Sequence, residues 1–128
     1  MVQNKVVLKF KSGAIIKGST ADFLPNKATF HLILENGETK EINSEILKAI
    51  FFVKDFEGNK SYTEQYKDSV AGGGRKIQVK FSDGEVVTGF TQGYTPNRPG
   101  FFLVPADKQS NNERIYIIRS ATQKVEFI

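Results

Sequence analysis

The chain has 128 residues, 39% of them hydrophobic and 25% charged, a composition that indicates a globular protein and excludes a disordered one. It contains no cysteine, which excludes disulfides and thiolate metal sites, and no run approaches the roughly 18 apolar residues of a membrane span. The net charge of +4 permits an anionic partner without requiring one. Because no apolar leader follows Met1, we expect a cytoplasmic protein.

An internal repeat dominates the sequence. Residues 5–18, KVVLKFKSGAIIKG, return as residues 76–89, KIQVKFSDGEVVTG, at an offset of 71 residues. The repeat predicts two units of about 50 to 55 residues, close to the lower limit for independent folding. We expect a first unit at 1–56, a connector at 57–75 and a second unit at 76–128.

Alternation of apolar and polar residues predicts β-strands throughout both units. In the first unit, the strands are expected at 5–10, 14–22, 30–35 and 38–43 and through 50–53. In the second unit, they are expected at 76–81, 85–93 and 101–104, in a longer hairpin with four inserted residues around 108–112, and through 125–128. After this insertion, the offset between the two copies is 75 residues, which matches Ile50 and Phe52 to Val125 and Phe127.

The residues between these strands predict tight turns and one point of curvature per unit. Ser12-Gly13 and Asp83-Gly84 are typical of two-residue hairpins. A glycine in the middle of the second strand, Gly18 or Gly89, indicates a bend, a bulge or a close backbone approach. A single 3₁₀ turn is expected before each last strand, at 44–47 and 119–122. The predicted fold class is all-β, a tandem repeat of two small five-stranded SH3-like or Sm-like barrels.

Three phenylalanines take the place of a polar residue in the other copy. Phe51 matches Glu126, Phe90 matches Ser19 and Phe102 matches His31. A position that is polar in one copy is expected to face outward in both, so each of these rings needs a covering partner. The rings either pack against the other unit or the connector, or they form an exposed patch for a protein partner or for self-association.

The matched loop after each second strand is the strongest candidate binding site. Each copy offers an aromatic ring, an amide and a cation, which together can stack a nucleobase and hold a phosphate. The alternative is a structural turn whose aromatic residue plugs the core. The candidate ligand-binding residues are Thr20, Phe23, Asn26 and Lys27 in the first unit, and Thr91, Gln92, Tyr94, Asn97 and Arg98 in the second.

Catalytic chemistry is not predicted. The only histidine, His31, lies in the middle of a strand, at a position occupied by phenylalanine in the other copy. No spacing of Ser, Thr or carboxylates matches a nucleophile motif, and a metal site would need several ligands gathered around one His. We therefore expect no enzymatic activity, no cofactor and no metal.

The order of strand, glycine turn, curved strand and Asp22-Phe23 resembles the first motif of Sm-like proteins. That family carries Ile/Leu-Arg-Gly before its last strand, whereas this chain has Leu47-Lys-Ala and Thr122-Gln-Lys in those places. The resemblance implies an Sm-like fold, and RNA binding and ring assembly are not carried over with it.

Residues 47–58 and 89–103 resemble a family of uncharacterised bacterial proteins that sometimes occur beside PilZ signalling domains. This resemblance covers nearly the whole chain and implies a role in bacterial regulation, but it transfers no residue role. Together the patterns predict an interaction module that binds a protein partner. The alternative is weak binding of single-stranded RNA or another anionic ligand through Tyr94, Asn97, Arg98 and their counterparts.

Overall fold

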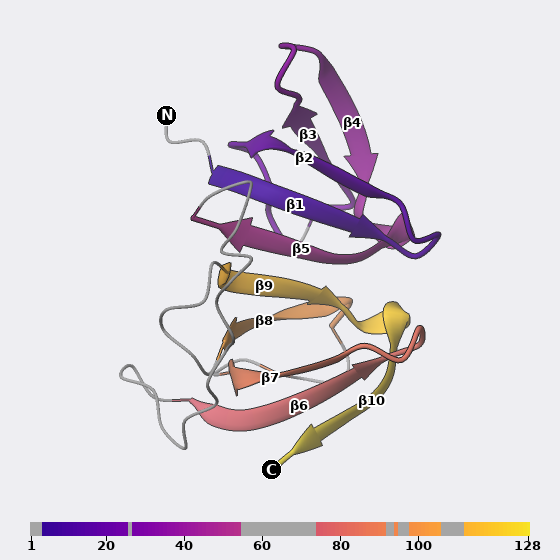
Figure 1. Cartoon of the computed structure of the whole chain (residues 1–128), viewed down its shortest axis with the longest axis vertical. Helices are drawn as coiled ribbons and strands as arrows, with labels where there is room; N and C mark the ends of the chain where they lie inside the picture. Colours follow the sequence, from indigo (N-terminus) through magenta and orange to yellow (C-terminus); the bar gives the residue numbers. More distant parts are fainter. Residues whose placement is uncertain (1–3, 26, 55–73, 92–93, 95–97, 106–111) are drawn as a thin grey trace, which may run out of the picture.

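The computed structural model describes residues 4–25, 27–54, 74–91, 94, 98–105 and 112–128, and it is built from β-strands, as predicted (Figure 1). The strands are β1 (Asn4–Phe10), β2 (Ile15–Thr20), β3 (Thr29–Ile33), β4 (Thr39–Asn43), β5 (Leu47–Val53), β6 (Arg75–Phe81), β7 (Val86–Thr91), β8 (Gly100–Pro105), β9 (Asn112–Ile118) and β10 (Thr122–Phe127). Within these ranges, no helix is long and apolar enough to cross a membrane. The predicted connector falls almost wholly outside the described residues.

All the described strands belong to one open antiparallel sheet in the order β10-β6-β7-β8-β9-β5-β1-β2-β3-β4. Two separate closed barrels are therefore not confirmed, because the sheet has free edges at β4 and β10 and is continuous across its middle. Each half nevertheless has the same internal order, β5-β1-β2-β3-β4 in one and β10-β6-β7-β8-β9 in the other. Figure 1 shows the two halves stacked, with β5 and β9 adjacent.

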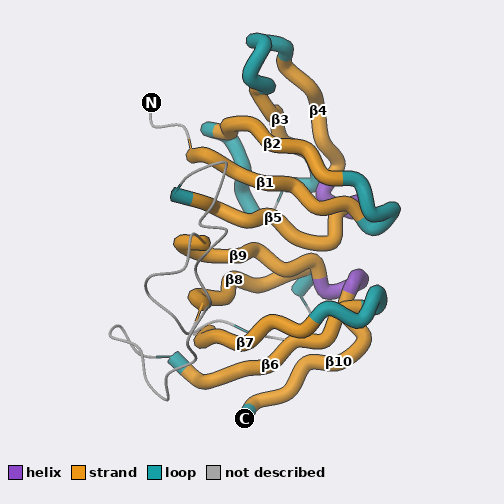
Figure 2. Tube along the Cα trace, in the orientation of Figure 1, coloured by secondary structure: helices purple, strands orange, loops and turns teal. Residues whose placement is uncertain are grey.

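The hairpins after β1 and β6 form with three-residue loops, 11–13 and 82–84, instead of the predicted two, because the amides of Phe10 and Phe81 donate to the carbonyls of Ala14 and Glu85. Gly13 and Gly84 have φ of 97° and 96°, a conformation that glycine adopts at little cost. Their amides donate to the carbonyls of Phe10 and Phe81, at 3.0 and 2.9 Å. The 3₁₀ turns η1 (Ser44–Ile46) and η2 (Arg119–Ala121) form before β5 and β10. Both lie on the right of the view in Figure 2.

The mid-strand glycines mark close backbone approaches. A Cβ added to Gly18 would lie 2.6 Å from the Ile33 carbonyl oxygen, and one added to Gly89 would lie 2.3 Å from that of Val104. The third strand of each half thus crosses directly over these glycines, where no side chain fits. Of the three alternatives that the sequence left open at these positions, the structure therefore shows the close backbone approach.

The two halves are joined by β5 and β9, which pair antiparallel with Ala49 opposite Ile117 and Phe51 opposite Ile115. Every residue of β5 is buried, so both of its faces are covered. We call this β5–β9 contact the joint. A strand that is covered on both faces reads as a continuous apolar run, as Ala49–Val53 does.

The side chains of the joint are shared between two hydrophobic cores. The first core contains Val6, Leu8, Phe30, Leu32, Ile42, Leu47, Ile50, Phe52, Tyr116 and Ile118. The second core contains Ala49, Phe51, Val53, Ile77, Val79, Phe81, Phe101, Leu103, Ile115, Ile117 and Ala121. Strand β5 therefore places alternate residues in the core of the other half, and β9 does the same in return, so that each half completes the core of its neighbour.

A polar network reinforces one end of the joint. The ammonium group of Lys48 on β5 lies 2.7 Å from Asp83 Oδ2, also binds Glu85, and sits 4.6 Å from the centre of the Phe81 ring. Burial alone would lower the pKa of Lys48, but the hydrogen bonds to Asp83 and Glu85 outweigh it and raise that pKa. Lys48 links the first half to the hairpin after β6, because both carboxylates belong to that hairpin.

Substituting Asp83→Asn is expected to remove an acid-sensitive part of this link. The Lys48 hydrogen bond lowers the Asp83 pKa below its ordinary value of 3.8. The folded state therefore favours the ionised carboxylate of Asp83. Its contribution to the free energy of unfolding is present above pH 3.8 and is lost as the pH falls through the lowered pKa. The difference in thermal midpoint between the wild type and D83N should be largest near neutral pH and should shrink on acidification. A difference that stays constant with pH would contradict the link.

Candidate functional site

The two matched threonines are structural clamps. Thr20 and Thr91 are buried, and their hydroxyls donate to the carbonyls of His31 and Phe102 at 2.9 and 2.8 Å. Each bond ties the end of the second strand of its half to the third strand. Both hydroxyls therefore donate their hydrogen within the fold.

The aromatic residue of each matched loop closes the end of a core. Phe23 meets Phe30 edge to face with ring centroids 5.2 Å apart, and Tyr94 meets Phe101 in the same way at 4.8 Å. Both aromatic residues are half-buried. This equivalent geometry agrees with the alternative that each loop is a structural turn whose aromatic residue covers the core.

The cations of the two loops are exposed. The Lys27 amide donates to the Leu24 carbonyl at 3.0 Å, and the Arg98 carbonyl accepts from Arg119 Nε at 3.1 Å. The other three candidates from the loops, Asn26, Gln92 and Asn97, lie outside the described residues.

The three phenylalanines selected from the repeat take up different environments. Phe51 is 5% exposed and belongs to the second core, so it is used for the contact within the chain and is not open to another molecule. Phe90 is also buried, but it belongs to neither core. Phe102 is half-buried and packs against the first core, across the joint from its own half.

Aromatic rings from both halves meet at the joint around Phe102. Its ring lies 4.9 Å from Tyr116, 6.2 Å from Phe52 and 6.5 Å from Phe23. The guanidinium of Arg114 stands over two of these rings, 4.4 Å from the centre of Phe52 and 5.1 Å from that of Phe102. The joint cluster is defined here as Phe23, Phe52, Phe102, Arg114 and Tyr116.

Arg98 adds a second positive charge to the neighbourhood of this cluster. Burial raises the pKa of the Tyr116 hydroxyl, and the positive charge of Arg98 opposes part of that rise. The sequence candidates Phe23 and Arg98, which come from different halves, are thus both near Tyr116. Among the described residues of the matched loops, these two members therefore converge on Tyr116.

Three residues of the joint cluster, Phe52, Arg114 and Tyr116, are not among the candidates drawn from the sequence. Tyr116 could have been found, because it matches Glu41 in the other copy just as Phe102 matches His31. Arg114 has no such signal, since Thr39 stands in the equivalent place and its importance comes only from the rings beneath it.

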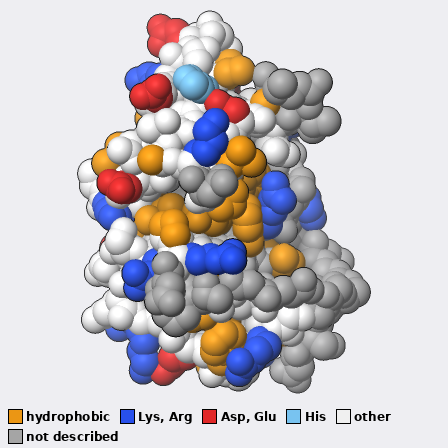
Figure 3. Space-filling view, turned by 180° about the vertical axis from the view of Figure 1, so that it is seen from behind, with side chains coloured by type: hydrophobic (Ala, Val, Ile, Leu, Met, Phe, Trp, Pro, Cys, Tyr) orange, Lys and Arg blue, Asp and Glu red, His pale blue; other side chains and the backbone are white. Residues whose placement is uncertain are grey.

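The surface at the height of the joint is apolar with basic surroundings. Figure 3 shows hydrophobic side chains gathered across the middle of one face, with Lys and Arg side chains beside them. Near Phe23, Leu24 is 51% exposed. Apolar and aromatic area beside arginine can bind a chain that carries both apolar and acidic groups.

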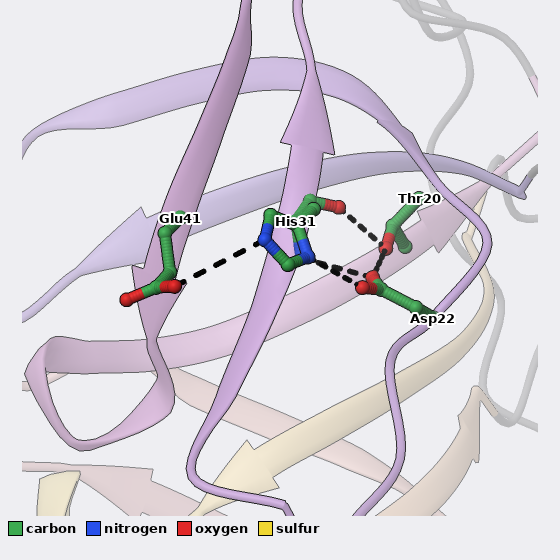
Figure 4. Close-up of polar contacts among 4 residues, drawn as sticks. All are labelled: Thr20, Asp22, His31 and Glu41. Carbon is green, nitrogen blue, oxygen red and sulfur yellow. Dashed lines mark hydrogen bonds and ion pairs between the residues drawn. The ribbon is translucent and has the colours of Figure 1, made fainter.

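A separate polar cluster lies on the first half (Figure 4). Asp22 accepts from the His31 amide at 2.9 Å and lies 2.7 Å from His31 Nδ1, while His31 Nε2 is 4.0 Å from Glu41. The hydrogen bond from the His31 side chain is the largest cause of the lowered Asp22 pKa. These contacts fasten the segment after β2 to β3.

The His31 cluster makes its side-chain contacts within the fold. Its only hydroxyl, that of Thr20, is buried and donates to a backbone carbonyl. Within the part of the chain that the structure describes, no three His, Asp or Glu side chains are grouped to hold a metal ion. The arrangement holds the segment after β2 against β3.

Comparison with known proteins places the chain in a family. Residues 2–128 match the family of unknown function DUF6982, and the chain belongs to that family. No curated protein and no solved structure matches it.

Proposed function

We propose that this member of the DUF6982 family is a non-enzymatic interaction module that binds a protein partner through the joint cluster. The observation that supports this most is the exposed Arg114 guanidinium, which lies 4.4 Å from the buried Phe52 ring of the first half and 5.1 Å from the half-buried Phe102 ring of the second. Aromatic residues and arginine are enriched where binding energy concentrates in protein interfaces. The resemblance to proteins found beside PilZ domains supports a role in bacterial regulation.

We interpret each half as one SH3-like or Sm-like unit of a tandem repeat. The identical strand order in the two halves supports this interpretation. So do the equivalent aromatic pairs Phe23–Phe30 and Tyr94–Phe101. In this view the joint cluster exists only because two units are fused, since neither half contains all of its residues.

The chemistry of the cluster indicates the kind of segment that binds. The N–H groups of a guanidinium suit the two oxygens of a carboxylate, and Arg114 is exposed. The half-buried rings of Phe23 and Phe102 and the exposed Leu24 side chain suit apolar side chains. The expected ligand is therefore a peptide segment with an Asp or Glu close to aromatic or aliphatic residues.

A library of random peptides displayed on phage, selected on the wild-type chain, tests this proposal. The peptides recovered should carry acidic and apolar residues together, and Arg114→Ala or Phe102→Ser should weaken their binding by about tenfold or more in fluorescence anisotropy. Arg75→Ala is the matched control, because Arg75 also stacks on a ring, that of Phe127 at 3.9 Å, but lies on β6 away from the joint. Equal binding by R114A, F102S and R75A would contradict the proposal.

Weak binding of single-stranded RNA is the second candidate, because the same rings and arginines could stack bases and hold phosphates. Titration of the wild type with a labelled oligouridylate at two salt concentrations distinguishes it. RNA binding should weaken steeply as salt rises, and Arg98→Ala should reduce the salt slope by about one. No binding at low salt would remove this candidate and leave the peptide proposal untouched.

A further inference from the structure

The joint is a head-to-tail contact between an edge strand of each half, and among the described strands one further edge of each kind remains, at β4 and at β10. Strand β4 occupies the place in the first half that β9 occupies in the second, and β10 occupies the place of β5. The pairing registers confirm this equivalence, since Ile50 lies opposite Leu8 as Val125 lies opposite Val79. Geometry alone would therefore let β10 of one chain pair with β4 of a second copy, and a head-to-tail contact of this kind can repeat without limit.

Five apolar residues are buried in the neighbouring half at the joint, beside the polar side chains of Lys48 and Arg114, which also reach across it. On β5 they are Ala49, Phe51 and Val53, which lie in the second core. On β9 they are Tyr116 and Ile118, which lie in the first core. They are the positions that any second joint would have to bury.

At the free edges, these same positions are polar in four of five cases. With the offset of 75 residues, Lys124, Glu126 and Ile128 on and after β10 stand for the three β5 residues, and Glu41 and Asn43 on β4 stand for the two β9 residues. Their polar groups are engaged locally: Lys124 lies 2.6 Å from Glu126, and Asn43 accepts from the Glu45 amide at 2.9 Å. Pairing the edges would bury these groups away from water.

The positions that face their own half are changed far less. Ile50 and Phe52 on β5 become Val125 and Phe127 on β10, and Ile117 on β9 is Ile42 on β4. The exception is Ile115, which is replaced by Lys40. The polar replacements are thus concentrated where a neighbouring unit would sit, and the core of each half is kept.

We infer that the joint is an interface restricted to a single use within the chain, and that Glu41 and Asn43 on β4 and Lys124 and Glu126 on β10 prevent a second copy from repeating it. Charged residues on edge strands are a common means of blocking strand pairing, because pairing would desolvate them. The consequence is a chain that remains monomeric although β4 and β10 lie at the edges of the described sheet. Each molecule therefore presents the joint cluster once.

Grafting the joint residues onto the free edges tests this inference. One variant carries Glu41→Tyr and Asn43→Ile on β4, and another carries Lys124→Ala and Glu126→Phe on β10. Loss of the Asn43 cap is tolerated in the equivalent place, since Ile118 precedes η2 without a side-chain cap. Analytical ultracentrifugation of an equimolar mixture should show a species of twice the 14.3 kDa mass of one chain, whereas each variant alone should remain single.

Two results would overturn the inference. One is a mixture that stays at the mass of one chain although both variants retain the circular dichroism of the folded wild type. The other concerns the wild type alone and does not depend on the variants folding. It is an oligomer of the wild type whose fraction rises as the protein concentration is raised about a hundredfold. This oligomer would also have to disappear in the Glu41→Pro variant, because proline blocks strand pairing at β4. A wild type that stays single over that range supports the inference.

Discussion

Replacing Phe51 with alanine is expected to lower the free energy of unfolding by about 3 to 5 kcal/mol, which is a large part of the stability of a small domain. Phe51 is 5% exposed, lies in the second core although it belongs to a strand of the first half, and carries the Lys9 ammonium 4.5 Å from its ring centre. The substitution removes a buried ring at the joint and leaves a cavity between the halves. Urea denaturation followed by circular dichroism measures the change.

The control for this substitution is Ile15→Ala, a truncation on β2 at a side chain that is 57% exposed. It should change the free energy of unfolding by no more than about 0.5 kcal/mol. If F51A were as mild as I15A, Phe51 would not be buried between the halves, and the shared core would be disproved.

Substituting Gly89 with alanine is expected to lower the free energy of unfolding by about 3 kcal/mol, although only one methyl group is added. The new Cβ would lie 2.3 Å from the Val104 carbonyl oxygen and 2.4 Å from Leu103 Cδ2. Leu103 is wholly buried in the second core, and the Val104 oxygen belongs to the backbone, so β8 as a whole would have to move. Thermal and urea unfolding both report this loss.

Gly37→Asn provides the matched glycine control. Gly37 has a φ of 88° and open space around the added atom, and asparagine tolerates this conformation better than most residues. The cost should therefore stay below about 1 kcal/mol. A G89A variant as stable as G37N would mean that β8 does not cross over β7 at this glycine.

Local structure could be predicted from the sequence because it is encoded by neighbouring residues. The period-two alternation of Val6, Leu8 and Phe10 specifies a half-buried strand, and the glycines Gly13 and Gly84 supply the positive φ of the hairpins. The polar-for-apolar exchange at Phe51 correctly identified a residue that needs a partner.

The continuous sheet could not be predicted in the same way. Each half has two edges, and the order in which edges of different halves pair depends on contacts between residues far apart in the chain. The apolar run Ala49–Val53 was the available indication, since a strand of a separate small barrel would be expected to alternate. The repeat drew attention to similarity between the halves, whereas the joint depends on the places where they differ.

The candidate site was predicted in part for a related reason. Thr20 and Thr91 recur in the two copies, and the equivalent bonds of their hydroxyls to the third strand give a structural reason for the repetition. The convergence of Phe23 and Arg98 near Tyr116 depends on the joint, and no pattern within one half contains it. A search for residues that are apolar in only one copy would have added Tyr116.

Native-state amide hydrogen exchange of the wild-type chain, read residue by residue by NMR, tests the pairing of β5 with β9 most directly. If these strands lie at the centre of one sheet, their amides should exchange only through global unfolding, while the outward amides of the free edges β4 and β10 exchange much faster. If the amides of Phe51 and its neighbours on β5 and β9 all exchanged as fast as those of β4, the halves would not be joined at these strands.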